Sequence, residues 1–261
     1  MEYSICIEMI FKEVEFLERP KKVKESGFEY FEFWTWQNKN RKALQTVVKD
    51  LKLKIASFSG DENFSMINGE EKEAYIDLLA KSIITAKDLN CRNLVIHSDA
   101  LLKNGQAKTL GRNLSTEEKF ENMYNILKKA APIAEKEKVR LVLEPLNSLV
   151  DHKNYFLDNP ETAFLLVKMV DSEYVKVLYD IYHMQIMVGN IIKTIRENID
   201  YIGYIHIADV PGRYEPGTGE LNFYNILQEL ARIKYNGIIG FELEPRVNSE
   251  LAIKKIKEVL I

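Results

Sequence analysis

The 261-residue sequence contains only two cysteines, Cys6 and Cys91. Two are too few for a disulfide framework or a thiolate zinc site, so we expect both thiols to be reduced and buried. The chain also lacks a basic excess, because 36 Lys and Arg stand against 39 Asp and Glu, for a net charge of −3. Such a chain is not expected to bind nucleic acid in bulk, since it cannot neutralise a row of phosphates.

Long apolar runs are missing as well. None approaches the ~20 residues that cross a bilayer, and acidic and basic residues interrupt any signal-peptide core within residues 1–16. We therefore expect no membrane partner and a cytoplasmic location. No stretch rich in Gly, Pro or Ser interrupts the chain, which predicts one domain over residues 1–261.

Short apolar segments alternate with longer amphipathic ones along the whole chain. The expected strands are 3–7, 30–34, 54–58, 93–97, 140–144, 176–180, 201–206 and 238–242. The expected helices are 13–26, 39–50, 70–89, 115–137, 160–171, 187–199, 222–234 and 248–260. Ser115 with Glu118 has the spacing of a capping box, and Asn159 followed by Pro160 is a typical helix start.

Eight strands, each followed by a helix, predict an α/β fold of the closed (β/α)8 TIM-barrel type. An open doubly wound sheet is the alternative. Its phosphate-binding turn after the first strand needs glycines, whereas residues 8–11 read Glu-Met-Ile-Phe. The barrel is therefore favoured.

Metal-binding side chains end four consecutive predicted strands: Glu144, Asp180, His206 and Glu242. Catalytic groups of this fold lie at the C-terminal strand ends, so these four are expected to converge. Three carboxylates and one imidazole favour a hard divalent ion such as Mn²⁺, Mg²⁺ or Co²⁺. Its charge would offset the cost of burying three carboxylates. The alternative is a buried network of these acids with Lys and Arg from neighbouring loops.

A divalent ion between two opposed glutamates suits proton abstraction beside a carbonyl. The ion would act as a Lewis acid on the carbonyl oxygen and stabilise the enediolate. Glu144 and Glu242 would be the acid–base pair. One glutamate moving a proton between two carbons gives an aldose–ketose isomerisation, whereas two glutamates on opposite faces of one carbon give an epimerisation.

Three segments carry a family resemblance: 144–147 (Glu-Pro-Leu-Asn), 179–185 and the long loop 211–222. With them the chain resembles the hydroxypyruvate isomerases among the xylose-isomerase-like TIM barrels, beside ketose 3-epimerases and apurinic endonucleases. The resemblance implies that Glu144, Asp180, His206 and Glu242 are metal ligands, with Glu144 and Glu242 as the acid–base pair. It also implies that His183 contacts the substrate and that Arg213 holds its oxygens or carboxylate.

Two positions depart from the isomerase pattern. His206 stands where hydroxypyruvate isomerases typically have glutamine and ketose 3-epimerases have histidine. Glu244 stands where the isomerases often carry lysine, which weakens the case for a small carboxylate substrate. A small 2-oxo acid or keto sugar is therefore expected, with hydroxypyruvate-isomerase-like activity ahead of a ketose 3-epimerase of the tagatose or psicose type.

Two further residues are expected at the same rim. His97 ends the fourth predicted strand and Trp34 ends the second, and both are expected to line the substrate pocket, with Trp34 as an apolar wall. The alternatives are a hydrogen-bonded structural histidine and ordinary packing at the rim. The aromatic residues after the second strand could equally form an interface in a homo-oligomer.

Two other functions remain open at this point. An apurinic-endonuclease-type phosphodiesterase would need more metal ligands than four histidines readily supply. A barrel that binds a sugar without converting it would have no need for two opposed glutamates.

Overall fold

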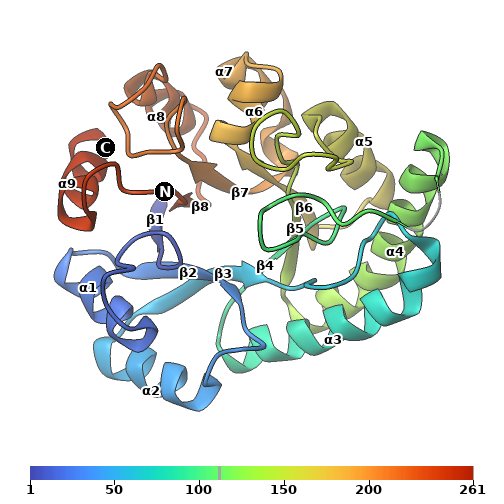
Figure 1. The fold of residues 1–261 in the computed structure, drawn as a ribbon, viewed down its shortest axis with the longest axis horizontal. Helices are drawn as coiled ribbons and strands as arrows, with labels where there is room; N and C mark the ends of the chain where they lie inside the picture. The colour runs from blue at the N-terminus through green and yellow to red at the C-terminus, as the bar shows by residue number, and fades with distance from the viewer. Residues whose placement is uncertain (111–112, 261) are drawn as a thin grey trace.

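The strands of the chain close into a parallel barrel in the order β1 to β8. The computed structural model describes residues 1–110 and 113–260. The helices follow one another around the outside of the strands (Figure 1), and the predicted (β/α)8 TIM barrel is therefore confirmed. The strands are β1 Glu2–Cys6, β2 Tyr30–Thr35, β3 Lys54–Ser59, β4 Asn93–Ile96, β5 Arg140–Leu143, β6 Val175–Asp180, β7 Ile202–Ile207 and β8 Ile238–Phe241.

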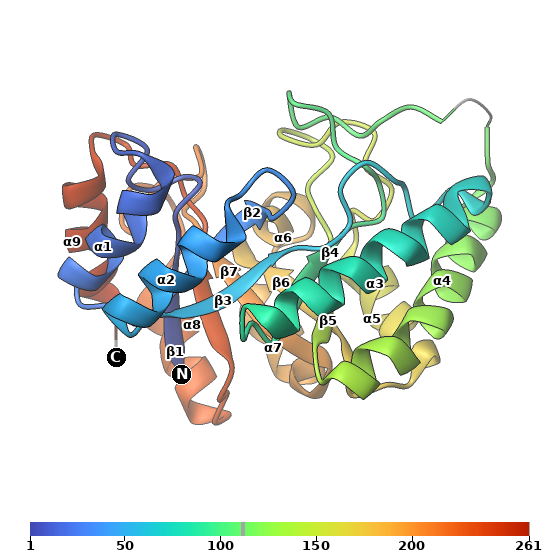
Figure 2. The ribbon, with the colours of Figure 1, turned by 90° about the horizontal axis from the view of Figure 1, so that it is seen from below.

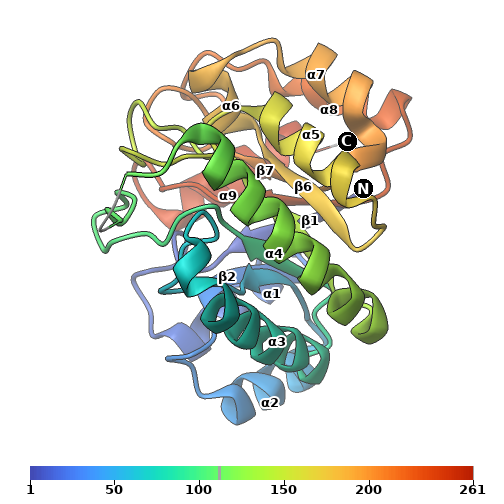
Figure 3. The same cartoon turned by 90° about the vertical axis from the view of Figure 1, so that its right-hand side faces the viewer.

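The outer layer consists of α-helices with short 3-10 segments. They are η1 Phe16–Glu18, α1 Arg19–Glu25, α2 Arg41–Leu51, η2 Gly69–Glu71, α3 Lys72–Asp88, α4 Thr116–Glu137, α5 Pro160–Val170, α6 Ile181–Met187, α7 Ile191–Asn198, η3 Ile199–Tyr201, α8 Phe223–Arg232 and α9 Ser249–Val259. The long helices α3 and α4 lie side by side (Figure 3). Ser115 and Glu118 form the expected capping box, and Asn159 caps α5 in front of Pro160. None of the helices in the described ranges is long and apolar enough to cross a membrane.

The helix predicted over 187–199 is present as α7, but it begins at Ile191, and the sequence interpretation missed α6 in front of it. This region holds the end of α6 and the whole of α7, separated where Gly189 and Asn190 take φ values of 63° and 54°. α6 follows β6 without a loop, because the Asp180 carboxylate accepts hydrogen bonds from the backbone N–H groups of Tyr182 and His183. Asp180 therefore ends a strand and caps a helix at once.

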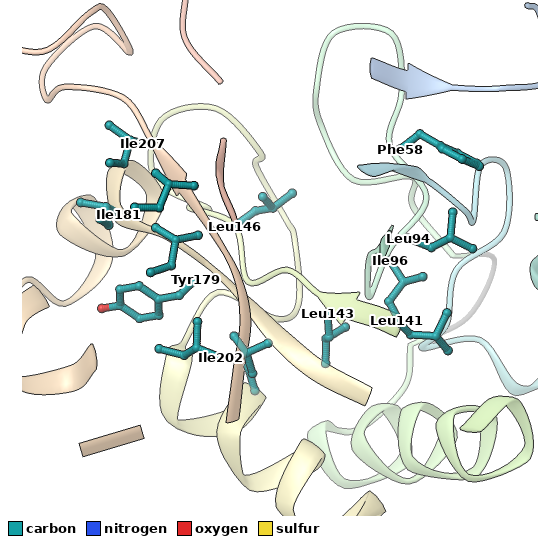
Figure 4. Packing of buried hydrophobic residues seen from close by; sticks show 14 of the residues in the cluster. Phe58, Leu94, Ile96, Leu141, Leu143, Leu146, Tyr179, Ile181, Ile202 and Ile207 are labelled. Carbon is teal, nitrogen blue, oxygen red and sulfur yellow. The ribbon is translucent and has the colours of Figure 1, made fainter. Parts of the chain in front are cut away.

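Side chains alternate along each strand between two apolar clusters, one between the strands and the helices and one inside the barrel. On β5, Leu141 and Leu143 face the outer helices and belong to the large apolar cluster, as Figure 4 shows from close by. Val142 between them belongs to the small cluster inside the barrel, together with Leu178 and Tyr204. Since successive side chains of a strand point to opposite faces, the residues two positions beyond these three also point inward.

The segments after β4 and β5 rise together at the end of the barrel opposite the N-terminus (Figure 2). The backbone N–H of Ala107 donates to the carbonyl of Lys153 at 3.1 Å, which joins the two segments. Residues 100–108 form a hairpin of their own, with a bridge between Leu101 and Ala107.

The loop after β7 is held by one buried carboxylate, that of Asp209, which has no exposed surface. Its two oxygens accept five backbone N–H groups, from Val210, Gly217, Thr218, Gly219 and Leu221. A Cβ on Gly219 would lie 2.0 Å from the Val210 carbonyl oxygen, so only glycine allows this close approach. The loop presents Arg213 to the mouth of the barrel.

We expect the substitution Asp209→Asn to lower the free energy of unfolding by about 3 kcal/mol, because an amide group would turn hydrogens toward backbone N–H donors. Urea denaturation followed by circular dichroism measures this loss. Glu220→Gln on the same loop is the control, since Glu220 is exposed and its replacement should change stability by less than about 0.5 kcal/mol. Equal stabilities of the two variants would contradict the role given to Asp209.

Candidate active site and metal centre

The inward rows of the barrel end in the four residues that the sequence placed together. Glu144, Asp180 and His206 lie two positions beyond the inward-facing Val142, Leu178 and Tyr204, and Glu242 follows β8 directly. The His206 Nδ1 atom lies 3.2 Å from Glu144 Oε1, 3.5 Å from Glu242 Oε2 and 3.9 Å from Asp180 Oδ2. Four ligand atoms, one from each residue, lie within 4.8 Å of one another.

This donor set fits a divalent ion. Around an octahedral ion with ligands at about 2.1 Å, neighbouring ligand atoms are about 3 Å apart and opposite ones about 4.2 Å. The distances from His206 Nδ1 to the three carboxylates, 3.2, 3.5 and 3.9 Å, lie within this range, and all four ligand atoms lie within 4.8 Å of one another. All four side chains are buried. The residues present can therefore hold a divalent metal.

Glu32 on β2 is the partner of His206 on its other side. Its Oε1 atom lies 3.1 Å from His206 Nε2, and Tyr204 donates its hydroxyl to the Glu32 carboxylate. Glu32 Oε1 and His206 Nε2 form no hydrogen bond with the described residues, but the negative charge of Glu32 at this distance favours a proton on Nε2, which would leave the lone pair of Nδ1 for a metal. Gly240 makes the room, because a Cβ there would lie 2.5 Å from Glu32 Oε2. The sequence interpretation missed Glu32, although an acid inside the apolar strand β2 is a usable signal.

Glu144 is held by two imidazoles. Its Oε1 faces His206, and its Oε2 lies 3.4 Å from His97 Nε2. Although burial opposes it, these two histidines hold the pKa of Glu144 well below its usual range, so the carboxyl is ionised. The other side of the His97 ring faces Asp61, with Nδ1 3.0 Å from Oδ1. Burial opposes protonation of His97, but Asp61 and then Glu144 raise its pKa to about 10.

The two carboxylate oxygens of Asp180 have different roles. Oδ1 caps α6, whereas Oδ2 faces His206. Burial, and then the charge of Glu144, raise the pKa of Asp180 to about 7. His206 also has its pKa raised well above the usual value, because Glu32 and Glu242 outweigh the effect of burial. Both groups therefore tend to hold a proton near neutral pH.

Glu242 accepts hydrogen bonds from a residue of β2 and from a residue of the loop after β7. Trp34 donates its indole N–H to Oε1 at 2.7 Å, and Arg213 donates a guanidinium N–H to Oε2. Arg213 has a φ of 58° and stands beside Gly212, so the tight loop turns its side chain inward. Its guanidinium also lies over the ring of Tyr182, 5.5 Å from the centroid. Trp34 and Arg213, both expected to contact substrate, thus converge on one glutamate.

His183 is fully buried beside Asp180, with Nε2 3.5 Å from Oδ2. Its Nδ1 accepts a hydrogen bond from the side-chain amide of Asn147 at 2.7 Å. The amide orientation is fixed, since Asn147 Oδ1 accepts from the backbone N–H groups of Val150 and Asp151. The proton of His183 is therefore on Nε2. Burial, followed by the charge of Arg213, lowers its pKa well below the usual value and keeps the ring neutral.

A cavity of about 740 Å³ opens over these residues and has the size of a small-molecule site. Its wall includes Trp34, His97, Glu144, Arg213 and Glu242. Asp180 and His183 are fully buried. Glu244, in contrast, is 42% exposed and forms an ion pair with Lys12 at the surface.

Comparisons with known proteins agree in sequence and in fold. The family model described as xylose isomerase-like TIM barrel matches residues 20–260. A putative hydroxypyruvate isomerase of Danio rerio is 30% identical over 99% of this chain and 95% of its own length. The hydroxypyruvate isomerase of Escherichia coli K12 is 29% identical, with 97% of each chain covered. A 2-oxo-tetronate isomerase of Haemophilus influenzae is 29% identical, with 94% of each covered.

Solved structures give the same picture. The structure titled AP endonuclease, family 2, from Brucella melitensis has a TM-score of 0.87 at 26% identity and covers 97% of this chain and 96% of its own. A D-psicose 3-epimerase from Clostridium cellulolyticum H10, solved with D-tagatose, has a TM-score of 0.80 at 20% identity. It covers 98% of this chain and 89% of its own, and at this identity the likeness concerns the fold.

We expect Glu32→Gln to weaken Mn²⁺ binding about 10- to 100-fold, because the amide would favour the wrong ring tautomer of His206. Titration calorimetry with Mn²⁺ measures the change. Glu29→Gln is the matched control, since that carboxylate is 67% exposed. An unchanged affinity in Glu32→Gln would remove Glu32 from the metal centre.

The affinity for a divalent ion should rise with pH, because Asp180 and His206 must lose protons before they can bind it. Below the Asp180 pKa of about 7, each pH unit removes about tenfold of the ionised form, and the apparent affinity should fall with it. Mn²⁺ titrations between pH 6 and pH 8, in two buffers of different ionisation enthalpy, measure both the affinity and the protons released. A flat pH profile without proton release would contradict this assignment.

Proposed function

The chain belongs to the xylose isomerase-like TIM barrel family and is an isomerase or epimerase, and we propose that it moves a proton beside the carbonyl of a short 2-oxo acid or keto sugar. The observation that carries the proposal is the pair of buried glutamates, Glu144 and Glu242, which both line the cavity and both face Nδ1 of His206. We propose hydroxypyruvate-isomerase-like chemistry first and ketose 3-epimerase chemistry as the alternative.

The proposed metal ligands are Glu144, Asp180, His206 and Glu242. When bound, a divalent ion (Mn²⁺, Mg²⁺ or Co²⁺) would supply Lewis-acid stabilisation of the negative charge that develops on the substrate. Glu32 supports this set through its negative charge beside His206 Nε2, and α6 supports it by fixing Asp180.

The proposed base is Glu144, whose proton affinity is set by the neighbouring side chains. Glu144 is ionised because His206 and His97 stabilise its charge, so it can accept a proton from the carbon next to the carbonyl. Glu242 accepts hydrogen bonds from Trp34 and Arg213, which hold its carboxylate in the wall of the cavity. A proton taken and returned by one glutamate gives isomerisation, and transfer between the two gives epimerisation.

Three other residues would bind the substrate. The neutral His183 offers an Nε2–H donor to a substrate oxygen. Arg213, partly neutralised by Glu242, can donate further N–H groups to a carboxylate or hydroxyl. Trp34 covers the cavity edge, where an apolar ring excludes water from a reactive enediolate.

A phosphodiesterase is the second candidate, because of the 26% identity with the structure titled AP endonuclease. Within residues 1–110 and 113–260, one group of four metal-binding side chains is found. With the net charge of −3, this group supports a small keto compound as substrate over a polyanion. The cytoplasmic location and the homo-oligomer stay predictions.

We expect Glu144→Gln to lower turnover by about 10²- to 10⁴-fold while the protein remains folded, because the amide cannot accept the proton. The measurement is proton NMR in D₂O with Mg²⁺-loaded protein and a panel of hydroxypyruvate, 2-oxo-tetronate and ketoses. Deuterium entry at C3 of a 2-oxo acid with an aldehyde or 3-oxo product indicates isomerisation. Deuterium entry with a new diastereomer indicates epimerisation.

Glu242→Gln should show the same loss if that glutamate returns the proton, and the side chain of Glu173, 87% exposed, provides the control Glu173→Gln. Full exchange in Glu144→Gln would exclude the acid–base mechanism, even if the substrate still bound. A barrel that only binds sugars would show binding without deuterium entry in any variant.

A further inference from the structure

His152 is the one histidine that the proposed function leaves without a task. It lies in the segment between β5 and α5, is 9% exposed and lines the cavity. Its Nδ1 lies 2.8 Å from the carbonyl oxygen of Gly105. A carbonyl oxygen only accepts hydrogen bonds, so Nδ1 carries the proton and Nε2 has a free lone pair. Nε2 is buried and has no hydrogen-bond partner among residues 1–110 and 113–260.

The neighbouring histidine is in the opposite tautomer. The rings of His152 and His183 are 5.1 Å apart between centroids and inclined at 59°. His183 accepts at Nδ1 from Asn147 and therefore carries its proton on Nε2, which is buried and lies 3.5 Å from Asp180 Oδ2 without a hydrogen bond to the described residues. Two adjacent imidazoles thus present one acceptor nitrogen and one donor nitrogen.

We infer that His152, in the wall of the cavity, is a specificity-determining residue whose Nε2 binds a hydroxyl group of the substrate. A hydroxyl can donate its hydrogen to this nitrogen. A carboxylate has no hydrogen for His152 and would face its lone pair. This inference rests on the proposed function and deepens it, because it names the group that the substrate presents here.

The charge state of His152 agrees with an acceptor role. Burial, and after it the nearby Arg213, lower the pKa of His152, so the ring is neutral near pH 7. Asp151 and Glu144 act in the other direction, as does the hydrogen bond to Gly105, but they do not outweigh burial.

The hairpin of residues 100–108 holds His152 in this orientation. Gly105 has a φ of 83°, and a Cβ there would lie 3.1 Å from the Asp151 carbonyl oxygen. The hydrogen bond from Ala107 to Lys153 fixes the hairpin to the His152 segment on the other side. The tautomer of His152 is therefore determined by a backbone carbonyl that side-chain substitutions leave in place.

The position of the pair indicates which hydroxyl is bound. His183 Nε2 lies 3.5 Å from Asp180, beside the proposed reacting centre. The carbonyl and the hydroxyl next to it are used at that centre, so the hydroxyl at His152 belongs to a further carbon. A hydroxylated oxo acid or ketose of four or more carbons fits this arrangement better than the three-carbon hydroxypyruvate.

The test compares two ligands that differ in one hydroxyl and cannot be turned over, since neither has a ketone or aldehyde group. They are D-erythronate and its 4-deoxy counterpart, 2,3-dihydroxybutanoate, titrated by calorimetry into the full chain with Mg²⁺. The wild type is expected to bind erythronate at least about tenfold more tightly. His152→Asn keeps a donor for the Gly105 carbonyl but has no acceptor atom at the place of Nε2, so the preference should fall below about threefold.

His152→Gln is the matched variant, because its amide oxygen can occupy the place of Nε2 and should restore part of the preference. Equal binding of the two ligands by the wild type would overturn the inference. So would an undiminished preference in His152→Asn, with thermal melts verifying that the variant is folded. If no ketose or 2-oxo acid exchanges deuterium while the preference is present, the proposed reaction fails and the hydroxyl subsite stands.

Discussion

Negative charge buried at the C-terminal end of the barrel is the constraint around which the site is built. Four carboxylates there have at most 8% of their surface exposed: Glu32, Glu144, Asp180 and Glu242. Isolated ions at such depth cost several kcal/mol each. The imidazoles of His97 and His206 and the guanidinium of Arg213 lie against them and offset this cost. The Asp209 loop, the α6 cap and the Asp61–His97 pair all serve to keep those partners in place.

The pattern of strands in the sequence was sufficient to predict the fold and the convergence of four side chains at one end of the barrel. Strand ends meet in a closed barrel, so residues 60 or 100 positions apart could be brought together from the sequence. Asp61 was not predicted as a site residue because it lies two residues beyond the end of β3. Glu32 was not predicted because it lies inside a strand. The helix α6 was not predicted, because Asp180 has the sequence pattern of a strand end and its capping function is visible only from its hydrogen bonds. Partners fixed by loop conformation, such as Gly105 for His152, leave no periodic signal at all.

The four histidines of the chain show how one side chain type acquires distinct chemistry. His97 lies between two carboxylates and is charged, and His206 is oriented by Glu32 toward the ligand cluster. His152 and His183 are neutral, with opposite ring nitrogens protonated. Each state follows from the atom that faces the second nitrogen of the ring. Carboxylates beside His97 and His206 favour the charged ring. A backbone carbonyl makes His152 a hydrogen-bond acceptor at Nε2, and a side-chain amide makes His183 a donor at Nε2.

The hydrogen bond between Trp34 and Glu242 has an optical consequence. The chain has two tryptophans, and Trp36 is bound to Ser82 away from the ligand cluster. The indole of Trp34 is 46% exposed and touches the carboxylate at the centre of the proposed chemistry. Charge or ligand changes at Glu242 therefore alter the surroundings of one of the only two indoles. The protein thus carries a natural fluorophore whose emission reports on its own site.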